Sequence, residues 1–471
     1  MNKKQKIIIP LLVLITVMFF IFQPPEGMSI KAWRTSNLTI ILAVLWMTET
    51  IPITITALLP IVLIPLFQIG GIKQATAPYA NELVFLFMGG FFIAAAIEKV
   101  NLHRRFAIMI INRIGYSKKR IILSFMFVTA FLSMWISNTA SVLIMLPMAL
   151  SILSELSEEA GTDERYEVAL LLSVAYSANV GGIATLIGTP PNAFTAAFLR
   201  EHYSIEISFM NWMIVGLTFS IAAFIALYLI IKFLFLNKSE KSKLIEHQKS
   251  SLFKINPISK AETKVFILFV FVAVGWISQP FLSKIYEGIN DTTIAMLGAI
   301  ILFIIPSGKA NEKILEWSDA QKISWGILIL FGGGLSLASV IQTSGLAVWL
   351  GNLFIPLKLF PPYFIVFIIS ITIILLTELT SNLATTATFI PIVASIATGM
   401  NENILLFVIP ATVAASCAFM LPVGTPPNAI IFSSNKIKIS DMIKTGIYMN
   451  FASIIIIMTI IYLVLPFLIN P

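Results

Sequence analysis

Long apolar stretches alternate with short polar ones along the whole of this 471-residue sequence. Several stretches continue for about 18 residues or more without a charge, which is long enough to cross the hydrocarbon core of a bilayer. The pattern predicts an all-α polytopic membrane protein with about 11 transmembrane helices. Their expected positions are 7–22, 36–50, 52–68, 83–99, 165–200 (interrupted), 211–236, 264–283, 290–306, 324–348, 403–435 (interrupted) and 441–468.

Two further apolar segments, 121–157 and 361–400, do not fit a single crossing. Each is too long for one helix across the membrane, and each is split near its middle by a short polar string. The strings are Ser137-Asn138-Thr139 and Ser381-Asn382-Leu383. We therefore expect each segment to enter the membrane and return as a re-entrant hairpin with its polar string at the tip.

The basic residues follow the positive-inside rule when both segments are hairpins. With a cytoplasmic N-terminus, 25 of the 31 lysines and arginines lie on the cytoplasmic side and 6 face outward. A full crossing at 121–157 would instead place the lysine-rich segment 237–264 outside. We expect a multi-pass protein of the cytoplasmic membrane. The net charge of +8 belongs to loops between spans, so no nucleic-acid partner is expected.

Three motifs occur twice in the same order, which indicates an internal duplication. The pairs are Leu86-Phe87-Met88-Gly89-Gly90 with Leu330-Phe331-Gly332-Gly333-Gly334, Ser137-Asn138 with Ser381-Asn382, and Gly188-Thr189-Pro190-Pro191-Asn192 with Gly424-Thr425-Pro426-Pro427-Asn428. An odd number of crossings separates matching motifs, so the two halves have opposite orientations. We expect an N-terminal helix (1–35), a first inverted repeat (36–236), a cytoplasmic linker (237–263) and a second inverted repeat (264–471).

The two Gly-Thr-Pro-Pro-Asn strings predict helices that are interrupted inside the membrane. Proline has no backbone donor and disfavours a helical residue before it, so two in succession leave carbonyls without partners. Such backbone is tolerated at membrane depth only where it is buried in protein or lines a wet cavity. The strings therefore mark the expected lining of a cavity at the bilayer midplane.

The Ser-Asn strings at the hairpin tips allow two interpretations that can both hold. Ser, Asn and Thr are ordinary N-caps for the helix that follows. A helix N-terminus also attracts anions through its free N–H groups and the positive end of its dipole. Glu378, three residues before Ser381, either bonds to backbone near the tip or helps to hold a cation, and the first role is favoured.

The distribution of charge narrows the kind of ligand. No Lys or Arg occurs within 121–164 or 359–435. An anion bound there would need helix ends, hydroxyls, amides and a bound cation such as sodium. Glu378 and the single cysteine, Cys417, do not make a catalytic set, so no enzyme activity and no cofactor are expected. A channel is a remoter alternative, because the paired elements lie within one chain rather than in a ring of subunits.

On these paired motifs the chain resembles the divalent anion:sodium symporter family, over nearly its whole length. The resemblance implies a secondary active transporter of small dicarboxylates, of the succinate, malate, fumarate and 2-oxoglutarate class. It also implies sodium as the coupling ion and a homodimer in the lipid bilayer. One domain of each subunit would carry the substrate across by an elevator movement. A sodium-independent dicarboxylate exchanger on the same scaffold stays open as an alternative.

The resemblance also assigns site residues. Substrate carboxylates would meet Ser137, Asn138, Thr139, Thr189, Ser381, Asn382, Leu383 and Thr425. A first sodium ion would be held by Ser133, Ser137, Asn138 and Gly188, and a second by Thr377, Thr380, Asn382 and Gly424. Leu383 departs from the family pattern, which has threonine at this position, so one carboxylate receptor has a hydroxyl donor fewer.

Overall fold

A computed structural model describes residues 3–115, 117–160, 163–236, 257–308 and 312–464. Within these ranges the regular elements are all helical, apart from one isolated bridge between Pro306 and Lys313. Eight of the described helices are long and apolar enough to cross a membrane, and several shorter apolar helices accompany them. The prediction of an all-α membrane protein is confirmed.

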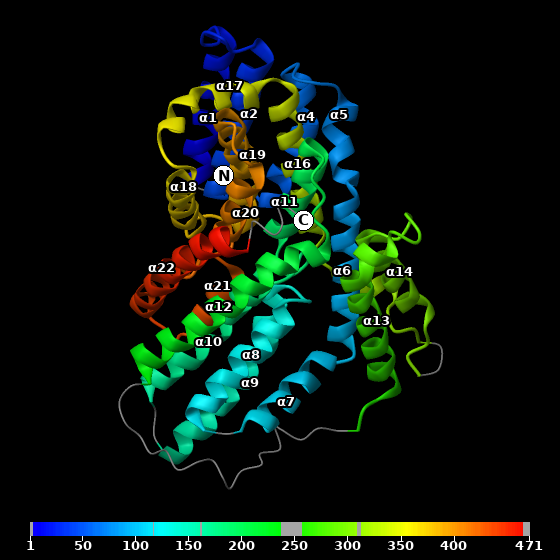
Figure 1. Cartoon of the computed structure of the whole chain (residues 1–471). Coiled ribbons are helices and arrows are strands. Elements are labelled where there is room, and N and C mark those ends of the chain that lie inside the picture. Colours follow the sequence, from blue (N-terminus) through cyan, green and yellow to red (C-terminus); the bar gives the residue numbers. More distant parts are fainter. Residues whose placement is uncertain (1–2, 116, 161–162, 237–256, 309–311, 465–471) are drawn as a thin grey trace.

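The helices follow one another along an elongated molecule (Figure 1). In chain order they are α1 (Lys3–Ile21), α2 (Ile30–Thr48), α3 (Ile53–Thr56), α4 (Leu59–Leu66), α5 (Ile72–Thr76), α6 (Glu82–Lys99), α7 (Leu102–Ile114), α8 (Lys118–Ser133), α9 (Asn138–Ala160), α10 (Glu164–Ile183), α11 (Pro190–Tyr203), α12 (Phe209–Phe235), α13 (Lys260–Leu282), α14 (Asp291–Ile304), α15 (Trp317–Ala320), α16 (Trp325–Thr343), α17 (Leu346–Leu353), α18 (Pro362–Thr377), α19 (Asn382–Met400), α20 (Ile404–Ala415), α21 (Pro426–Phe432) and α22 (Ile439–Leu463). Short 3₁₀ helices cover Ala77–Ala80 and Ile355–Leu359.

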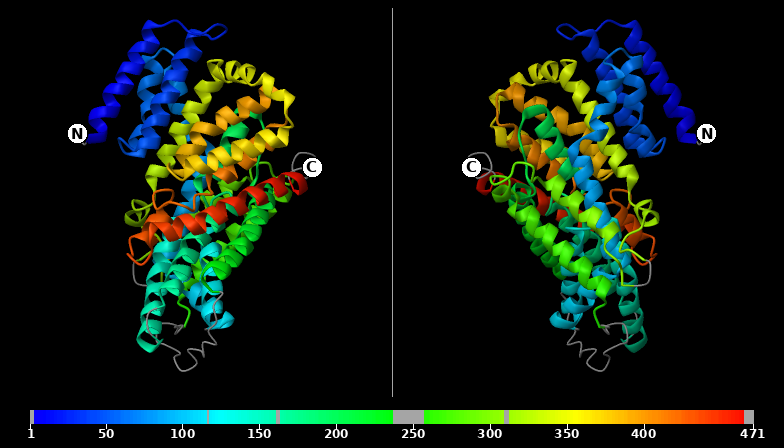
Figure 2. Two further views of the ribbon diagram at one scale, coloured as in Figure 1. Left: turned by 90° about the vertical axis from the view of Figure 1, so that its left-hand side faces the viewer. Right: turned by 90° about the vertical axis from the view of Figure 1, so that its right-hand side faces the viewer.

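Both predicted hairpin segments fold as two helices joined by a tight turn. In the first, α8 ends at Ser133 and α9 begins at Asn138, and in the second α18 ends at Thr377 and α19 begins at Asn382. The two pairs approach the middle of the molecule from opposite ends, with α8 and α9 below and α18 and α19 above (Figures 1 and 2). Both tips therefore point toward the centre.

The two Gly-Thr-Pro-Pro-Asn strings lie where helices stop and restart. The first interruption separates α10 from α11, and the second separates α20 from α21. In both cases the prolines occupy the first helical positions of the new segment, where their missing donors are no loss. Thr189 and Thr425 stand just before them in extended conformation.

Several predicted boundaries differ from the observed ones. The crossing expected at 52–68 divides into α3 and α4, because Pro60 cannot donate to Thr56 and so cannot join the two halves. α2 begins inside the expected N-terminal segment 1–35, since the Ser29 hydroxyl caps it by accepting from the Ala32 N–H at 3.0 Å.

The predicted crossing at 324–348 ends early, because Gly345 turns the chain into α17 with a φ of 84°. The basic stretch after α6, expected as a loop, contains the amphipathic helix α7. Of the expected linker 237–263, residues 237–256 lie outside the described part, and α13 begins before the linker's expected end. The last residues of the crossing at 441–468 also lie outside it.

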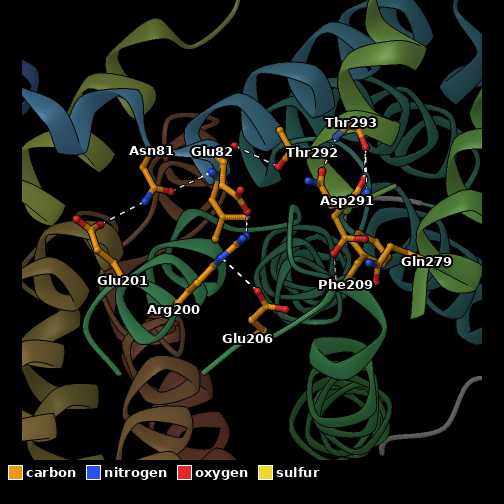
Figure 3. Close-up of polar contacts among 12 residues, drawn as sticks. Asn81, Glu82, Arg200, Glu201, Glu206, Phe209, Gln279, Asp291, Thr292 and Thr293 are labelled. Atoms are coloured by element: carbon orange, nitrogen blue, oxygen red, sulfur yellow. Dashed lines mark hydrogen bonds and ion pairs between the residues drawn. The ribbon is translucent and has the colours of Figure 1, made fainter. Parts of the chain in front are cut away.

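Polar contacts join the region between α11 and α12 to the N-terminal ends of α6 and α14 (Figure 3). Arg200 at the end of α11 forms an ion pair with Glu82 of α6. The Asp291 carboxylate accepts the Phe209 N–H at 2.7 Å, and the Thr292 hydroxyl donates to the Glu82 carbonyl at 3.2 Å. These contacts hold α11 and α12 against α6 and α14 in this conformation.

Close packing behind the first hairpin depends on a glycine in α10. A Cβ atom built on Gly181 would lie 2.2 Å from the carbonyl oxygen of Ala130 in α8. Backbone atoms cannot move aside as the end of a side chain can. α8 can therefore approach α10 this closely only with glycine at this position.

We expect Gly181→Ala to destabilise the protein by about 1–3 kcal/mol, as overpacking of a dense interior does. The measurement is the thermal melting temperature of purified protein in detergent. Gly90→Ala is the matched control, because a Cβ on this mid-helix glycine would meet Ile187 at an ordinary 3.6 Å. Equal melting temperatures for both variants would contradict the close approach of α8 and α10.

Candidate substrate and cation site

One cavity of about 610 Å³ lies where the four predicted motifs meet. Its lining combines the tips of both hairpins with the strings that interrupt both broken helices. The eight residues predicted to bind substrate all line it, namely Ser137, Asn138, Thr139, Thr189, Ser381, Asn382, Leu383 and Thr425. The rest of the wall comes from the end of α2, from α3, from α6 and from α16. The structure thus brings residues of both repeats around one space of a size typical for small ligands.

Both hairpin tips present a helix N-terminus to this cavity. α9 begins at Asn138 and α19 at Asn382, and both asparagines line it. The Ser137 hydroxyl caps α9 by accepting the Ala140 N–H at 3.2 Å, whereas the side chain of Ser381 makes no cap bond. The N–H groups of two first turns, with the positive ends of two dipoles, therefore face a shared space, where a negative group is favoured.

The tip asparagines are oriented in the same way in both repeats. Asn138 accepts a hydrogen bond through Oδ1 from the Ser133 hydroxyl at 2.5 Å, and Asn382 accepts one from the Thr377 hydroxyl at 2.9 Å. The amide oxygens thus point back into their own hairpins, beside the residues predicted to hold sodium. Both asparagines also line the cavity, so each connects its own hairpin with the shared space.

The two motif glycines lie against oxygen atoms. A Cβ on Gly188 would lie 2.5 Å from the Gly182 carbonyl oxygen and 3.0 Å from that of Ser133. A Cβ on Gly424 would lie 3.3 Å from the carbonyl oxygen of Glu378. Carbonyl, hydroxyl and amide oxygens are the kind of ligand that hard cations prefer. Both predicted sodium sets therefore have suitable donor chemistry.

The predicted sodium residues differ in their position relative to the cavity. Ser133 and Thr377 sit behind the tips and outside the cavity lining, bonded to the tip asparagines. Thr380 is turned toward its own hairpin, where its hydroxyl pairs with that of Thr385 at 2.5 Å and donates to the Leu376 carbonyl. Thr380 is thus the member of the second set whose hydroxyl is already engaged elsewhere.

Two asparagines that close the Gly-Thr-Pro-Pro-Asn strings hold the broken helices in place, a role the sequence analysis missed. Asn192 Nδ2 donates to the carbonyls of Gly182, Ile183 and Thr185 at 3.2, 3.2 and 2.7 Å. In the second repeat, Asn428 Nδ2 donates to the carbonyls of Ala418 and Leu421 at 3.2 and 3.0 Å. The sequence signal for this role was the repetition of Asn at the same place in both strings.

Asn179 of α10 links the two repeats and was also missed. Its Nδ2 donates to the Thr425 hydroxyl at 3.2 Å and to Asn428 Oδ1 at 3.3 Å. The residue is almost fully buried in α10. Polar side chains are costly inside the membrane unless they are paired, so this asparagine fastens α10 to the second interrupted helix.

Glu378 has the structural role that the sequence analysis favoured. Its carboxylate accepts the backbone N–H groups of Phe419, Met420 and Leu421 at 2.8 to 3.1 Å. The Asn450 side chain of α22 donates to it at 2.8 Å. A buried carboxylate is stable only with such partners. Glu378 thus fixes the interruption after α20 to the second hairpin.

A second cavity of about 570 Å³ adjoins the first and leads away from it. The two share Phe91, Ser137, Thr139, Ser324 and Ile327 in their linings. The second cavity is also lined by Glu98, Lys99, Asp319 and Lys322, with Lys99 and Asp319 paired at 2.7 Å. The two cavities thus adjoin, and the second one carries the charged side chains.

Comparison with known proteins agrees with this geometry. The profile of the family described as "Sodium:sulfate symporter transmembrane region" matches residues 2–469. The protein named sodium-dependent dicarboxylate transporter SdcS of Staphylococcus saprophyticus is 40% identical over 473 residues, covering 97% of this chain and 90% of that relative. A protein of the same name from Staphylococcus aureus is 42% identical with the same coverage.

Solved structures support the fold. The Alcanivorax borkumensis YdaH transporter and Neisseria gonorrhoeae MtrF each align with a TM-score of 0.59 at 12% identity, covering 96% of this chain and 98% of theirs. At this identity the likeness concerns the architecture alone. The family profile and the two staphylococcal relatives extend over nearly the whole chain. The chain therefore belongs to the divalent anion:sodium symporter family of membrane transporters.

Proposed function

We propose that this protein is a secondary active transporter that moves small dicarboxylates, of the succinate, malate, fumarate and 2-oxoglutarate class, across the cytoplasmic membrane together with sodium. The observation that carries the proposal is a single cavity with two anion-attracting helix N-termini and no lysine or arginine in its lining. Two receptors in one cavity suit a ligand with two carboxylates. The relatives at 40% and 42% identity are named sodium-dependent dicarboxylate transporters, which supports the same substrate class.

Each carboxylate would be met by the tip of one hairpin and the threonine of one interrupted helix. At the first end the donors are Ser137, Asn138 and Thr139 with Thr189. At the second end they are Ser381 and Asn382 with Thr425, and Leu383 contributes no donor. Hydroxyl and amide groups give hydrogen bonds to a carboxylate without adding a fixed charge.

Sodium would supply the positive charge that the side chains lack. The first ion would use Ser133, Ser137, Asn138 and Gly188, and the second Thr377, Thr380, Asn382 and Gly424. Because Asn138 and Asn382 belong to both the cation and the substrate sets, an ion bound behind a tip would orient the amide that meets the carboxylate. Binding of sodium and substrate would therefore be coupled through these two side chains.

The transport step is proposed as an elevator movement. The hairpins, the broken helices and their neighbours α12 and α22 would move as one body. The remaining helices would form a fixed scaffold within a homodimer. The N-terminus would be cytoplasmic, and the path past Lys99 and Lys322 would open the site to the cytoplasm in the conformation described here. Repeats of opposite orientation suit alternating access, since either half can open in turn.

A sodium-independent exchanger is the second candidate. The paired helix N-termini favour it, because each can stabilise an anion by up to about 2 kcal/mol in favourable geometry. An exchanger would move labelled substrate only when unlabelled dicarboxylate is present on the opposite side. A channel is disfavoured, since the site is built from paired elements of one chain rather than from a ring of subunits.

Uptake by proteoliposomes tests the proposal. Vesicles containing the protein should accumulate labelled succinate when sodium is high outside and low inside, and should not do so with a choline gradient. The expected accumulation needs no internal dicarboxylate. Uptake that depends on internal dicarboxylate alone would show the exchanger instead, and uptake of none of the four dicarboxylates would refute the substrate class.

Asn138→Ala and Asn382→Ala should each abolish this uptake while leaving a folded protein. Each change removes the amide of a residue that lines the cavity, together with the acceptor for a neighbouring hydroxyl. Asn403→Ala is the control, because Asn403 caps α20 by accepting the Leu405 N–H outside the cavity lining. Near-normal transport by either tip variant would show that the tips do not bind substrate.

Leu383→Thr should strengthen dicarboxylate binding by about 0.5–1.5 kcal/mol, the contribution of one hydrogen bond. Leu383 lines the cavity, and the threonine hydroxyl would add the donor that the second receptor lacks. Leu383→Val is the matched control, since valine has nearly the shape of threonine without the hydroxyl. Equal affinities for the Thr and Val variants in a binding titration would mean that this position does not face the ligand.

A further inference from the structure

Among all the residues that line the substrate cavity, one carries a formal charge, and it is an acid. Glu49 lines the cavity together with both hairpin tips, and it follows directly after α2. The other lining residues are apolar side chains, hydroxyls, amides, glycines and prolines. A carboxylate beside an anion site repels the proposed substrate. Its presence therefore calls for a function other than direct substrate binding.

The backbone at Glu49 places this residue at the turn that ends α2. The residue adopts a left-handed conformation with φ of 49° and ψ of 36°, which glycine or asparagine adopts more readily. A left-handed residue is a common way for a helix to end, and here it turns the chain from α2 toward α3. The C-terminal end of α2 lies at the same place, so the negative end of its dipole adds to the charge of the carboxylate.

The turn that carries Glu49 is fixed from both sides. The hydroxyls of Thr48 and Thr50 pair at 2.7 Å, and Gln5 of α1 donates to the Thr50 carbonyl at 3.1 Å. Pro52 then limits the backbone before α3. The backbone of the turn is thus fixed, and it places Glu49 as an exposed residue in the lining of the cavity.

We propose that Glu49 sets the charge selectivity of the cavity. It draws sodium toward the hairpin tips ahead of the substrate, and it disfavours anions that carry more than two negative charges. Two sodium ions neutralise a dicarboxylate, whereas a tricarboxylate leaves one negative charge uncompensated beside Glu49. This inference rests on the proposed function and adds the residue that separates dianions from trianions.

The test compares uptake of labelled succinate and labelled citrate at one sodium concentration and pH 8, where citrate is a trianion. Glu49→Gln keeps the length of the side chain and removes the charge. It should lower the succinate-to-citrate uptake ratio by about threefold to tenfold, as expected for a charge at close range near the surface of a protein. The sodium concentration for half-maximal succinate uptake should rise. An unchanged ratio would overturn the proposal.

Two controls separate this effect from others. Glu49→Asp retains the charge and should retain most of the selectivity. Glu98→Gln removes an exposed carboxylate that lines the adjoining cavity but not this one, and it should leave the ratio unchanged. An equal change in the Glu98 variant would reveal a general effect of surface charge and overturn the proposal.

A further measurement is independent of the substrate. If the unsubstituted protein takes up no succinate, the proposed function fails, but sodium alone should still raise its melting temperature in detergent. Glu49→Gln should then need about threefold to tenfold more sodium for the same rise. The same sodium dependence in both proteins would overturn the role of Glu49, whatever substrate the transporter carries.

Discussion

The structure of the site depends on how backbone groups are satisfied where helices stop inside the membrane. Lipid offers no hydrogen bonds, so each interrupted helix must find partners for its free carbonyls within the protein. Asn192 takes up three carbonyls of the first interruption, and Asn428 takes up two of the second. With these loops fixed, Gly188 and Gly424 lie against oxygen atoms behind the tips, and Thr189 and Thr425 line the cavity. The side-chain amides of Asn192 and Asn428 therefore satisfy the free carbonyls of the interruptions and also fix the loops that line the proposed site.

The two halves are alike in plan but not in detail. In the first repeat the Thr185 hydroxyl donates to the carbonyl of Met134, which follows Ser133. In the second repeat Glu378, which follows Thr377, accepts three backbone N–H groups of the loop after α20. At this place the second half thus carries a buried carboxylate where the first half has Met134, and its tip has Leu383 where the first has Thr139. The two ends of a symmetric dicarboxylate would meet different receptors.

Much of this arrangement could be predicted from the sequence. Proline pairs and polar strings inside apolar segments are costly in lipid, so their repetition pointed to the tips and the interruptions. The family resemblance then named eight substrate residues, and all of them line the cavity. The hydrogen bonds of Asn179 could not be predicted, because its partners in the other repeat are 246 and 249 positions away in the sequence and only folding brings them together. The break between α3 and α4 was missed because the segment 52–68 is apolar throughout, which is the pattern of a single crossing. Glu49 was missed because it belongs to no repeated motif, and only the shape of the cavity assigns it to the site.

We propose that a site without basic residues holds a dianion only because sodium is bound beside it. The most direct measurement is a titration of succinate binding to the purified protein in sodium buffer and in choline buffer of equal ionic strength. We expect much weaker binding in choline. Succinate should also raise the affinity for sodium by the same factor by which sodium raises the affinity for succinate, since linkage is reciprocal. Equal succinate affinity in both buffers would show that sodium is not required and that the helix N-termini alone stabilise the bound anion.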